Sequence, residues 1–110
     1  MASPLLTLVE TPTFAKRRPG LLSDEEYRLA QIALARDPEL GAVIPGAGGL
    51  RKVRWELEGR GKRGGARVIY YWAVAQGVIL LLFIYSKSEL DNLTKGQLKA
   101  LAHVVKEEFK

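Results

Sequence analysis

The sequence predicts one domain, residues 1–110, of the α+β class, in which a small antiparallel β-sheet is flanked by N-terminal helices and one C-terminal helix. The chain has 110 residues, 47% hydrophobic and 26% charged, which suffices for one core but not two. Apolar and polar residues alternate in the second half, as is typical of strands. On either side of that region, a capping signal is followed by apolar residues at helical spacing, which predicts a helix. The expected sheet is a three-strand meander plus an N-terminal strand.

The first half of the chain predicts one strand and two helical segments. Residues 5–10 are rich in apolar side chains and favour an opening strand. Residues 14–20 end in a Pro-Gly pair, which predicts a helical turn followed by a break. Ser23 and Glu26 have the spacing of a capping box, so a helix should cover about residues 24–36.

The second half predicts a turn-rich connection and then the meander. The connection, residues 39–49, contains a proline and four glycines. Residues 52–57 alternate polar and apolar side chains and predict a strand with one buried face. Two further strands, residues 66–74 and 78–85, are joined by a Gln-Gly turn. The last of these runs is apolar on both faces, so we expect it in the interior of the sheet.

The C-terminal element is predicted to be an amphipathic helix. Thr94 and Gln97 repeat the capping-box spacing. Apolar residues then recur at helical intervals, namely Leu98, Leu101, Ala102, Val105 and Phe109.

Positive charge is concentrated in one segment. The chain carries 17 Lys and Arg against 12 Asp and Glu, a net charge of +5. Residues 51–67 hold seven basic and two acidic residues, so this segment accounts for the whole excess. A neutral body with one basic segment indicates a surface for a polyanion, although a solvated loop has the same composition.

Composition excludes several classes of protein. The absence of cysteine excludes a disulfide framework, a cysteine-ligated zinc and a thiol nucleophile. His103 is the only histidine, which excludes a metal site built from paired histidines, and we expect no cofactor. The N-terminus lacks the basic region of a signal peptide, and the longest apolar run is too short to cross a membrane. We therefore expect a cytoplasmic protein with no membrane partner.

Residues 59–64, Gly-Arg-Gly-Lys-Arg-Gly, match the G-x-G-x-x-G pattern of dinucleotide-binding loops. Such a loop must be followed by a helix and, about twenty residues on, by a carboxylate, whereas a strand pattern follows here. A Walker A loop is excluded because Lys62 precedes Arg63 rather than Ser or Thr. Two interpretations remain, a flexible hairpin or a hairpin that presents Arg60, Lys62 and Arg63 to phosphates.

A set of cations is predicted to share one face of the meander. Lys52 and Arg54 are two residues apart in a strand, so both point away from Val53 and Trp55. Arg67 lies inside the next strand, where a long cation is unfavourable unless it faces a site. Tyr85 and Lys87 have the same two-residue spacing and reach that face if the third strand stays extended to Lys87. Cations with an aromatic side chain among them suit contact with a nucleic acid.

Three segments carry a resemblance to a known family. They are Gly46-Ala-Gly-Gly-Leu-Arg-Lys-Val-Arg-Trp55, Gly59-Arg-Gly-Lys-Arg-Gly-Gly-Ala-Arg-Val-Ile-Tyr-Tyr71 and Ile84-Tyr-Ser-Lys87, with Ser23-Asp-Glu-Glu-Tyr27 ahead of them. In this order they resemble the RelE/ParE-superfamily toxins of bacterial type II toxin–antitoxin modules, in particular the RelE-like branch of HigB toxins. The resemblance implies a RelE-like fold and a ribosome-dependent mRNA endonuclease that cleaves the codon in the ribosomal A site.

The resemblance also implies, by position, the catalytic set Lys52, Arg54, Arg67, Tyr85 and Lys87. Cleavage by attack of the 2′-OH on the adjacent phosphate needs a base, charge stabilisation and a proton for the 5′-oxygen. We assign Arg54 and Arg67 to the phosphate, Lys52 or Tyr85 as the base, and Lys87 as the acid or a charge stabiliser. No metal is required. The residues expected to bind RNA or the ribosome are Arg51, Arg60, Lys62 and Arg63, although Arg51 falls on the Trp55 side of its strand.

The resemblance further implies a cognate antitoxin, HigA-like and with a helix-turn-helix domain, through which the complex would contact operator DNA. Two rival interpretations stay open. ParE-type relatives share the fold and poison DNA gyrase without cleaving RNA, and a non-catalytic basic module would bind RNA or the ribosome with a steep salt dependence.

Overall fold

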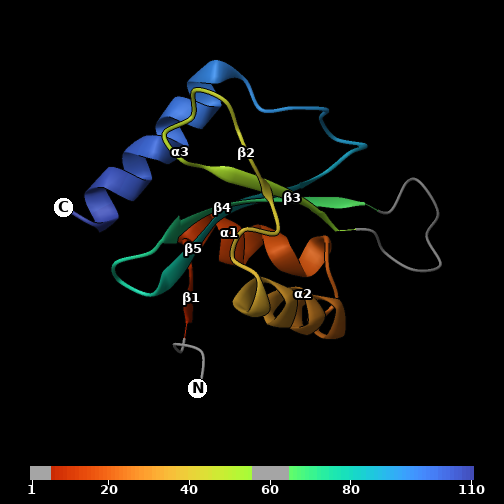
Figure 1. Cartoon of the computed structure of the whole chain (residues 1–110). Coiled ribbons are helices and arrows are strands. Elements are labelled where there is room, and N and C mark those ends of the chain that lie inside the picture. Colours follow the sequence, from red (N-terminus) through yellow and green to blue (C-terminus); the bar gives the residue numbers. More distant parts are fainter. Residues whose placement is uncertain (1–5, 56–64) are drawn as a thin grey trace.

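A five-stranded sheet separates two layers of helices (Figure 1) in the computed structural model, which describes residues 6–55 and 65–110. Helices α1 (Pro12–Arg17) and α2 (Asp24–Arg36) lie against one side, called here the α2 face. Helix α3 (Lys95–Glu108) lies on the other side, the α3 face. The α+β class and the flanking helices are as predicted.

The strands are β1 (Thr7–Glu10), β2 (Ala42–Val43), β3 (Arg51–Trp55), β4 (Ala66–Ala73) and β5 (Val78–Ser86), in the spatial order β1-β5-β4-β3-β2. The meander β3-β4-β5 is antiparallel throughout, as its short connections predict. Strand β5 has neighbours on both edges, which confirms the interior position expected from its apolar character.

The sheet differs from the expected antiparallel sheet in two respects. Strand β1 pairs with β5 in parallel. The chain between them contains α1, α2 and the other three strands, so no hairpin fixes their relative direction. Strand β2 lies within the connection that we predicted to be rich in turns, where we expected no strand. It has two residues between Gly41 and Pro45, too few for an alternating pattern to be detected.

The helices begin at the predicted caps. In α2 the Ser23 hydroxyl accepts from the Glu26 N–H and the Glu26 carboxylate accepts from the Ser23 N–H. Thr94 and Gln97 form the same reciprocal pair at the start of α3. The predicted helical turn before α2 is α1 followed by a short 3₁₀ segment, Arg18–Gly20.

Each face of the sheet has its own apolar cluster. The cluster on the α2 face is formed mainly by Phe14, Leu22, Tyr27, Leu34, Val53, Val68, Tyr70, Ile79, Leu81 and Ile84. The cluster on the α3 face is formed by Ala47, Leu50, Ile69, Leu80, Leu82, Tyr85 and Val105. The connection before β3 therefore belongs to the α3 layer, since Ala47 and Leu50 are buried there.

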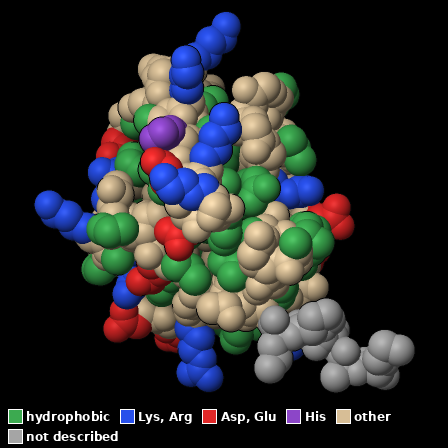
Figure 2. Space-filling model, turned by 90° about the vertical axis from the view of Figure 1, so that its left-hand side faces the viewer, with side chains coloured by type: hydrophobic (Ala, Val, Ile, Leu, Met, Phe, Trp, Pro, Cys, Tyr) green, Lys and Arg blue, Asp and Glu red, His purple; other side chains and the backbone are tan. Residues whose placement is uncertain are grey.

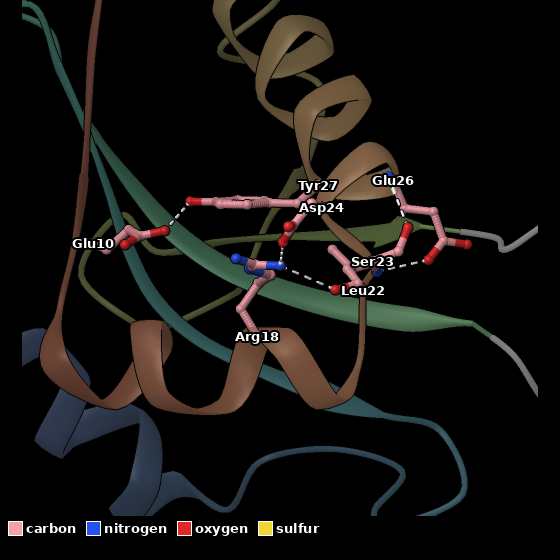
Figure 3. Close-up of polar contacts among 7 residues, drawn as sticks. All are labelled: Glu10, Arg18, Leu22, Ser23, Asp24, Glu26 and Tyr27. Carbon is pink, nitrogen blue, oxygen red and sulfur yellow. Dashed lines mark hydrogen bonds and ion pairs between the residues drawn. The ribbon is translucent and has the colours of Figure 1, made fainter.

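A polar cluster ties β1, the 3₁₀ segment after α1, and α2 together on the α2 face (Figure 3). It is called here the α2 polar cluster and consists of Glu10, Arg18, Asp24 and Tyr27. Tyr27 donates a hydrogen bond to the Glu10 carboxylate. Arg18 donates to Asp24 at 2.8 Å and to the Leu22 carbonyl at 3.2 Å, and its guanidinium lies 4.6 Å from the centre of the Tyr27 ring. Every member thus has a partner of complementary chemistry, although the buried Nε of Arg18 makes no hydrogen bond with a described residue.

Strand β5 contains a β-bulge. Ile69 of β4 pairs with Phe83, and the next residue, Tyr70, pairs with Leu81, so Leu82 has no partner across the ladder. The Leu82 carbonyl instead accepts a hydrogen bond from the Thr11 hydroxyl at 3.0 Å. The extra residue shifts the alternation of side chains, so Leu82 and Phe83 both pack on the α3 face.

No helix in residues 6–55 and 65–110 is long and apolar enough to cross a membrane.

Candidate functional site

Arg54, Arg67 and Tyr85 form a row across three adjacent strands on the α3 face. In the register of the sheet Arg54 pairs with Arg67, and Arg67 pairs with Tyr85. Directly opposite residues have Cβ atoms about 4.5–5.5 Å apart, so the three side chains are immediate neighbours. This row, called here the cationic row, is the arrangement that the alternation of β3 predicted.

Two like charges face each other in this row. Arg67 is 7% exposed, whereas Arg54 is exposed. No residue in the described part of the chain pairs with either guanidinium through a hydrogen bond or an ion pair. Like charges directly opposite on neighbouring strands are destabilising, and burial of an unpaired cation adds to this. An anionic ligand would remove both penalties at once.

Tyr85 contributes a polar group that has no partner within the described part of the chain. The side chain is buried and its hydroxyl makes no hydrogen bond there. Burial raises the pKa of Tyr85 above its ordinary value of 10.0, and the charges of Arg67 and Arg54 oppose that rise. The phenol is therefore neutral at physiological pH and acts as a donor beside the two cations.

Lys52 precedes Arg54 by two residues in β3 and points to the same face. It pairs with Ile69 in the ladder, and its Nζ donates to the Asn92 side-chain carbonyl at 3.1 Å. Asn92 comes from the segment that connects β5 to α3. Lys52, Asn92 and Tyr85 line a cavity of about 210 Å³ whose other walls are Ile44, Ile69, Leu93 and Leu98. No acidic side chain of the described residues lines it.

The other predicted site residues are placed differently. Lys87 lies beyond the end of β5, in a turn, and is exposed. Our condition that the strand stays extended to Lys87 is therefore not met. Arg51 lies on the α2 face, where it donates to the Gly41 carbonyl at 2.8 Å and pairs with Glu39 at 3.7 Å. Arg60, Lys62 and Arg63 lie outside the residues that the structure describes.

Glu89 and His103, which we did not include in the predicted site, have partners outside the cationic row. Glu89 accepts from Arg17 at 2.6 Å and from the Ser86 N–H at 3.0 Å, and Arg17 belongs to α1 rather than to the cationic row. His103 is exposed on α3, 3.9 Å from Glu107. Residues 6–55 and 65–110 contain no group of three or more side chains suited to a metal.

Sequence reasoning missed Asn92 as part of this site. It follows β5 in a segment without regular structure, where no periodicity predicts the direction of a side chain. Only the tertiary contact with Lys52, 40 positions away, reveals it.

The described cations of the site lie on the α3 face near β3. The side of the molecule that carries the C-terminal end of α3 shows acidic, basic and hydrophobic side chains interspersed (Figure 2). The cationic row, with a neutral donor at one end and Lys52 beside it, is suited to bind a phosphodiester.

No protein-family model matches the sequence. The structure is similar to that of a double mutant of the E. coli toxin RelE in the free state, with a TM-score of 0.63 and 14% sequence identity. The match covers 93% of this chain and 98% of that chain. This chain therefore has a RelE-like fold, with the α+β architecture predicted from its sequence.

Proposed function

We propose that this chain, one domain over residues 1–110, is the toxin of a type II toxin–antitoxin module, of the RelE-like HigB branch. Its activity is ribosome-dependent, metal-independent cleavage of mRNA in the A site. The observation that carries the proposal is the pairing of Arg54 with Arg67 beside the unpartnered hydroxyl of Tyr85. This arrangement is unfavourable by itself and becomes favourable around a phosphate.

The proposed reaction is a transesterification. The 2′-oxygen loses its proton to a base and attacks the adjacent phosphorus, the bond from phosphorus to the 5′-oxygen breaks, and that oxygen takes up a proton. The products are a 2′,3′-cyclic phosphate and a 5′-hydroxyl. Arg54 and Arg67 hold the phosphate and stabilise the charge that develops on its oxygens, a role worth about 3–4 kcal/mol for one donor.

The structure favours a specific division of roles at the row. Because the pKa of Tyr85 is raised, this phenol is suited to donate a proton or hydrogen bond and is poorly suited to be the base. Lys52 is then the candidate base, held next to the cavity by Asn92. Lys87, exposed in the turn after β5, is kept as a charge stabiliser at the rim.

Access to Tyr85 requires a movement. The side chain is fully buried, and Asn92 and Leu93 form part of the cavity wall beside it. A phosphate that reaches the hydroxyl must displace the segment that carries these two residues. Release of the Lys52–Asn92 hydrogen bond is part of that step.

The partners follow from the proposed class. A HigA-like antitoxin with a helix-turn-helix domain would neutralise the toxin, and the complex would reach operator DNA through the antitoxin. Arg60, Lys62 and Arg63 remain predicted contacts to ribosomal RNA, in the cytoplasm where translation occurs. For Arg51, which already binds Gly41 and Glu39, such a contact would be an additional role.

Primer extension on a defined mRNA, with and without ribosomes, tests the proposal. We expect new 5′ ends inside codons only when ribosomes are present. A parallel supercoiling assay with DNA gyrase separates the ParE-like alternative. Inhibited supercoiling without cut mRNA, or ribosome binding without either effect, would replace the proposed activity by one of the rivals.

A further inference from the structure

A second cavity lies beside the site, between the connection before β3 and the first turns of α3. Its volume is about 560 Å³, and it is lined by residues 45–48 on one side and by Lys95, Leu98, Lys99 and Ala102 on the other. It is called here the α3 pocket. A cavity of this size is in the range that accommodates small organic ligands.

The wall of the α3 pocket that the connection before β3 forms is held in place by hydrogen bonds and by packing. The connection folds back on itself through hydrogen bonds from the Ile44 N–H to the Leu50 carbonyl, 2.8 Å, and from the Ala47 N–H to the Ile44 carbonyl, 3.2 Å. Ala47 and Leu50 are buried in the α3-face cluster. Gly48 has a positive φ of 69°, and a Cβ there would come within 3.7 Å of the Ala102 side chain, so the loop closes onto the helix at this point.

The charges at the pocket are arranged for an anion. Lys95 and Lys99 are four residues apart on one face of α3, and neither forms an ion pair or hydrogen bond with another described residue. The first turn of α3 contains no acidic residue, whereas that of α2 contains Asp24, Glu25 and Glu26. A cation at a helix N-terminus is unfavourable because it repels the positive end of the helix dipole. A bound anion would turn that repulsion into attraction.

The α3 pocket adjoins the cavity at the cationic row. Leu98 lines both, and Ile44 of one is followed directly by Pro45 of the other. Cations therefore lie at three neighbouring places, with Arg54 and Arg67 in the row, Lys52 at the cavity beside it, and Lys95 and Lys99 at the α3 pocket. A chain with a phosphate at each repeat can contact all three places, whereas a single phosphate cannot.

We propose that the α3 pocket binds a nucleotide of the same single-stranded RNA whose phosphodiester lies at the cationic row. Lys95 and Lys99 contact its phosphates, and the apolar walls formed by Pro45, Ala47 and Ala102 contact the base. The inference rests on the proposed function only in taking RNA as the polymer. It adds a subsite that positions the strand at a distance from the reacting atoms.

The test measures binding separately from cleavage. The probe is a short fluorescein-labelled oligoribonucleotide with 2′-O-methyl groups, which cannot undergo attack by the 2′-oxygen, titrated without ribosomes at several salt concentrations. For the variant K95A/K99A we expect affinity about 25-fold lower at 0.1 M salt and a logarithmic salt slope smaller by about 1.4, the loss of two single-strand phosphate contacts. The matched control K106A/K110A removes two charges from the same end of the chain outside the pocket and should retain the wild-type slope.

A second variant tests the base subsite. Ala102→Phe fills the pocket without a change of charge, so we expect weaker binding of the probe with the wild-type salt slope. Wild-type affinity and slope in K95A/K99A would overturn the inference. Loss of binding to the antitoxin or to empty ribosomes, with the probe bound normally, would also overturn it and assign the pocket to another partner. If the wild type binds the probe through these lysines but cuts no mRNA on ribosomes, the subsite stands and the proposed activity fails.

Discussion

The two faces of the sheet differ in whether their arginine and tyrosine side chains have partners. In the α2 polar cluster, Arg18 and Tyr27 are matched by Asp24 and Glu10. In the cationic row, Arg67 and Tyr85 are buried beside Arg54, and no described residue carries a compensating acid or acceptor for them. The first arrangement stabilises the fold by itself, while the second has no compensating partner among the described residues. Residue type alone therefore does not distinguish a structural arginine from a functional one, and its partners do.

The strongest test of this contrast is Arg67→Ala. The variant should lower the single-turnover rate of mRNA cleavage on programmed ribosomes by about 10²–10³-fold, because one donor to the developing charge is lost. Its thermal stability should equal or exceed that of the wild type, since an unpaired buried cation is removed. Full cleavage activity in this variant would show that the cationic row is not the active site.

A matched pair of tyrosine variants makes the comparison within one residue type. Tyr85→Phe should reduce cleavage by about 10- to 150-fold, the equivalent of one hydrogen bond to a charged group, without loss of stability. Tyr70→Phe should do the reverse, because the Tyr70 hydroxyl donates to the Pro38 carbonyl at 2.7 Å and accepts from the Gly41 N–H at 2.8 Å. We expect it to lower the free energy of unfolding by about 1–3 kcal/mol with cleavage retained. Cleavage rates and denaturant titrations of both variants check the pair.

Arg18→Ala should affect stability alone. It removes two hydrogen bonds and the contact with the Tyr27 ring, and we expect the free energy of unfolding to fall by about 1–2 kcal/mol. Arg28→Ala, on the exposed side of α2, is the control and should change it by less than about 0.5 kcal/mol. Reduced cleavage by folded Arg18→Ala protein would contradict a purely structural role for this cluster.

The smallest expected effect concerns the ion pair between Arg17 and Glu89. The hydrogen bond from Arg17, helped by the Ser86 N–H, holds the pKa of Glu89 below its ordinary value of 4.5. A carboxyl with a lowered pKa in the folded state stabilises the fold above about pH 4.5 and loses this contribution as the pH falls through its folded pKa. Glu89→Gln should therefore lower stability at pH 7 by only about 0.2–1 kcal/mol and flatten the acid limb of the stability curve. Thermal unfolding from pH 3 to pH 7 measures the stability at neutral pH and its loss in acid. An unchanged loss of stability in acid would contradict the role given to the Arg17–Glu89 pair.

Local signals in the sequence predicted the helices and the faces on which the cations of β3 lie. The caps at Ser23 and Thr94 are formed by side chains three positions from their partners, so both could be identified without tertiary information. Alternation in β3 likewise put Lys52 and Arg54 on one face and Arg51 on the other. These properties depend on neighbours in the sequence.

Features that depend on distant parts of the chain could not be predicted in the same way. The parallel pairing of β1 joins residues about 70 positions apart, and Asn92 reaches Lys52 across 40 positions. The burial of Tyr85 arises from the packing of α3 and its preceding segment over the sheet. Our assignment of Tyr85 as a possible base did not include that burial, which raises the pKa of the phenol and favours the role of donor.

The bulge at Leu82 determines which side chain of β5 lies beside Arg67. Leu80 and Leu82 point to the α3 face, and strict alternation from them would send Tyr85 to the opposite side and bring Ile84 next to Arg67. The bulge takes the one extra residue out of the ladder and so keeps Tyr85 opposite Arg67, and the hydroxyl of Thr11, the N-cap of α1, binds the carbonyl of the bulged Leu82. A regular ladder over the same residues would exchange the two sides of the last four residues of β5, whereas deletion of Leu82 would remove the bulge and leave them on their present sides. The position of Tyr85 beside Arg67 thus depends on the bulge as well as on the residue types in β5.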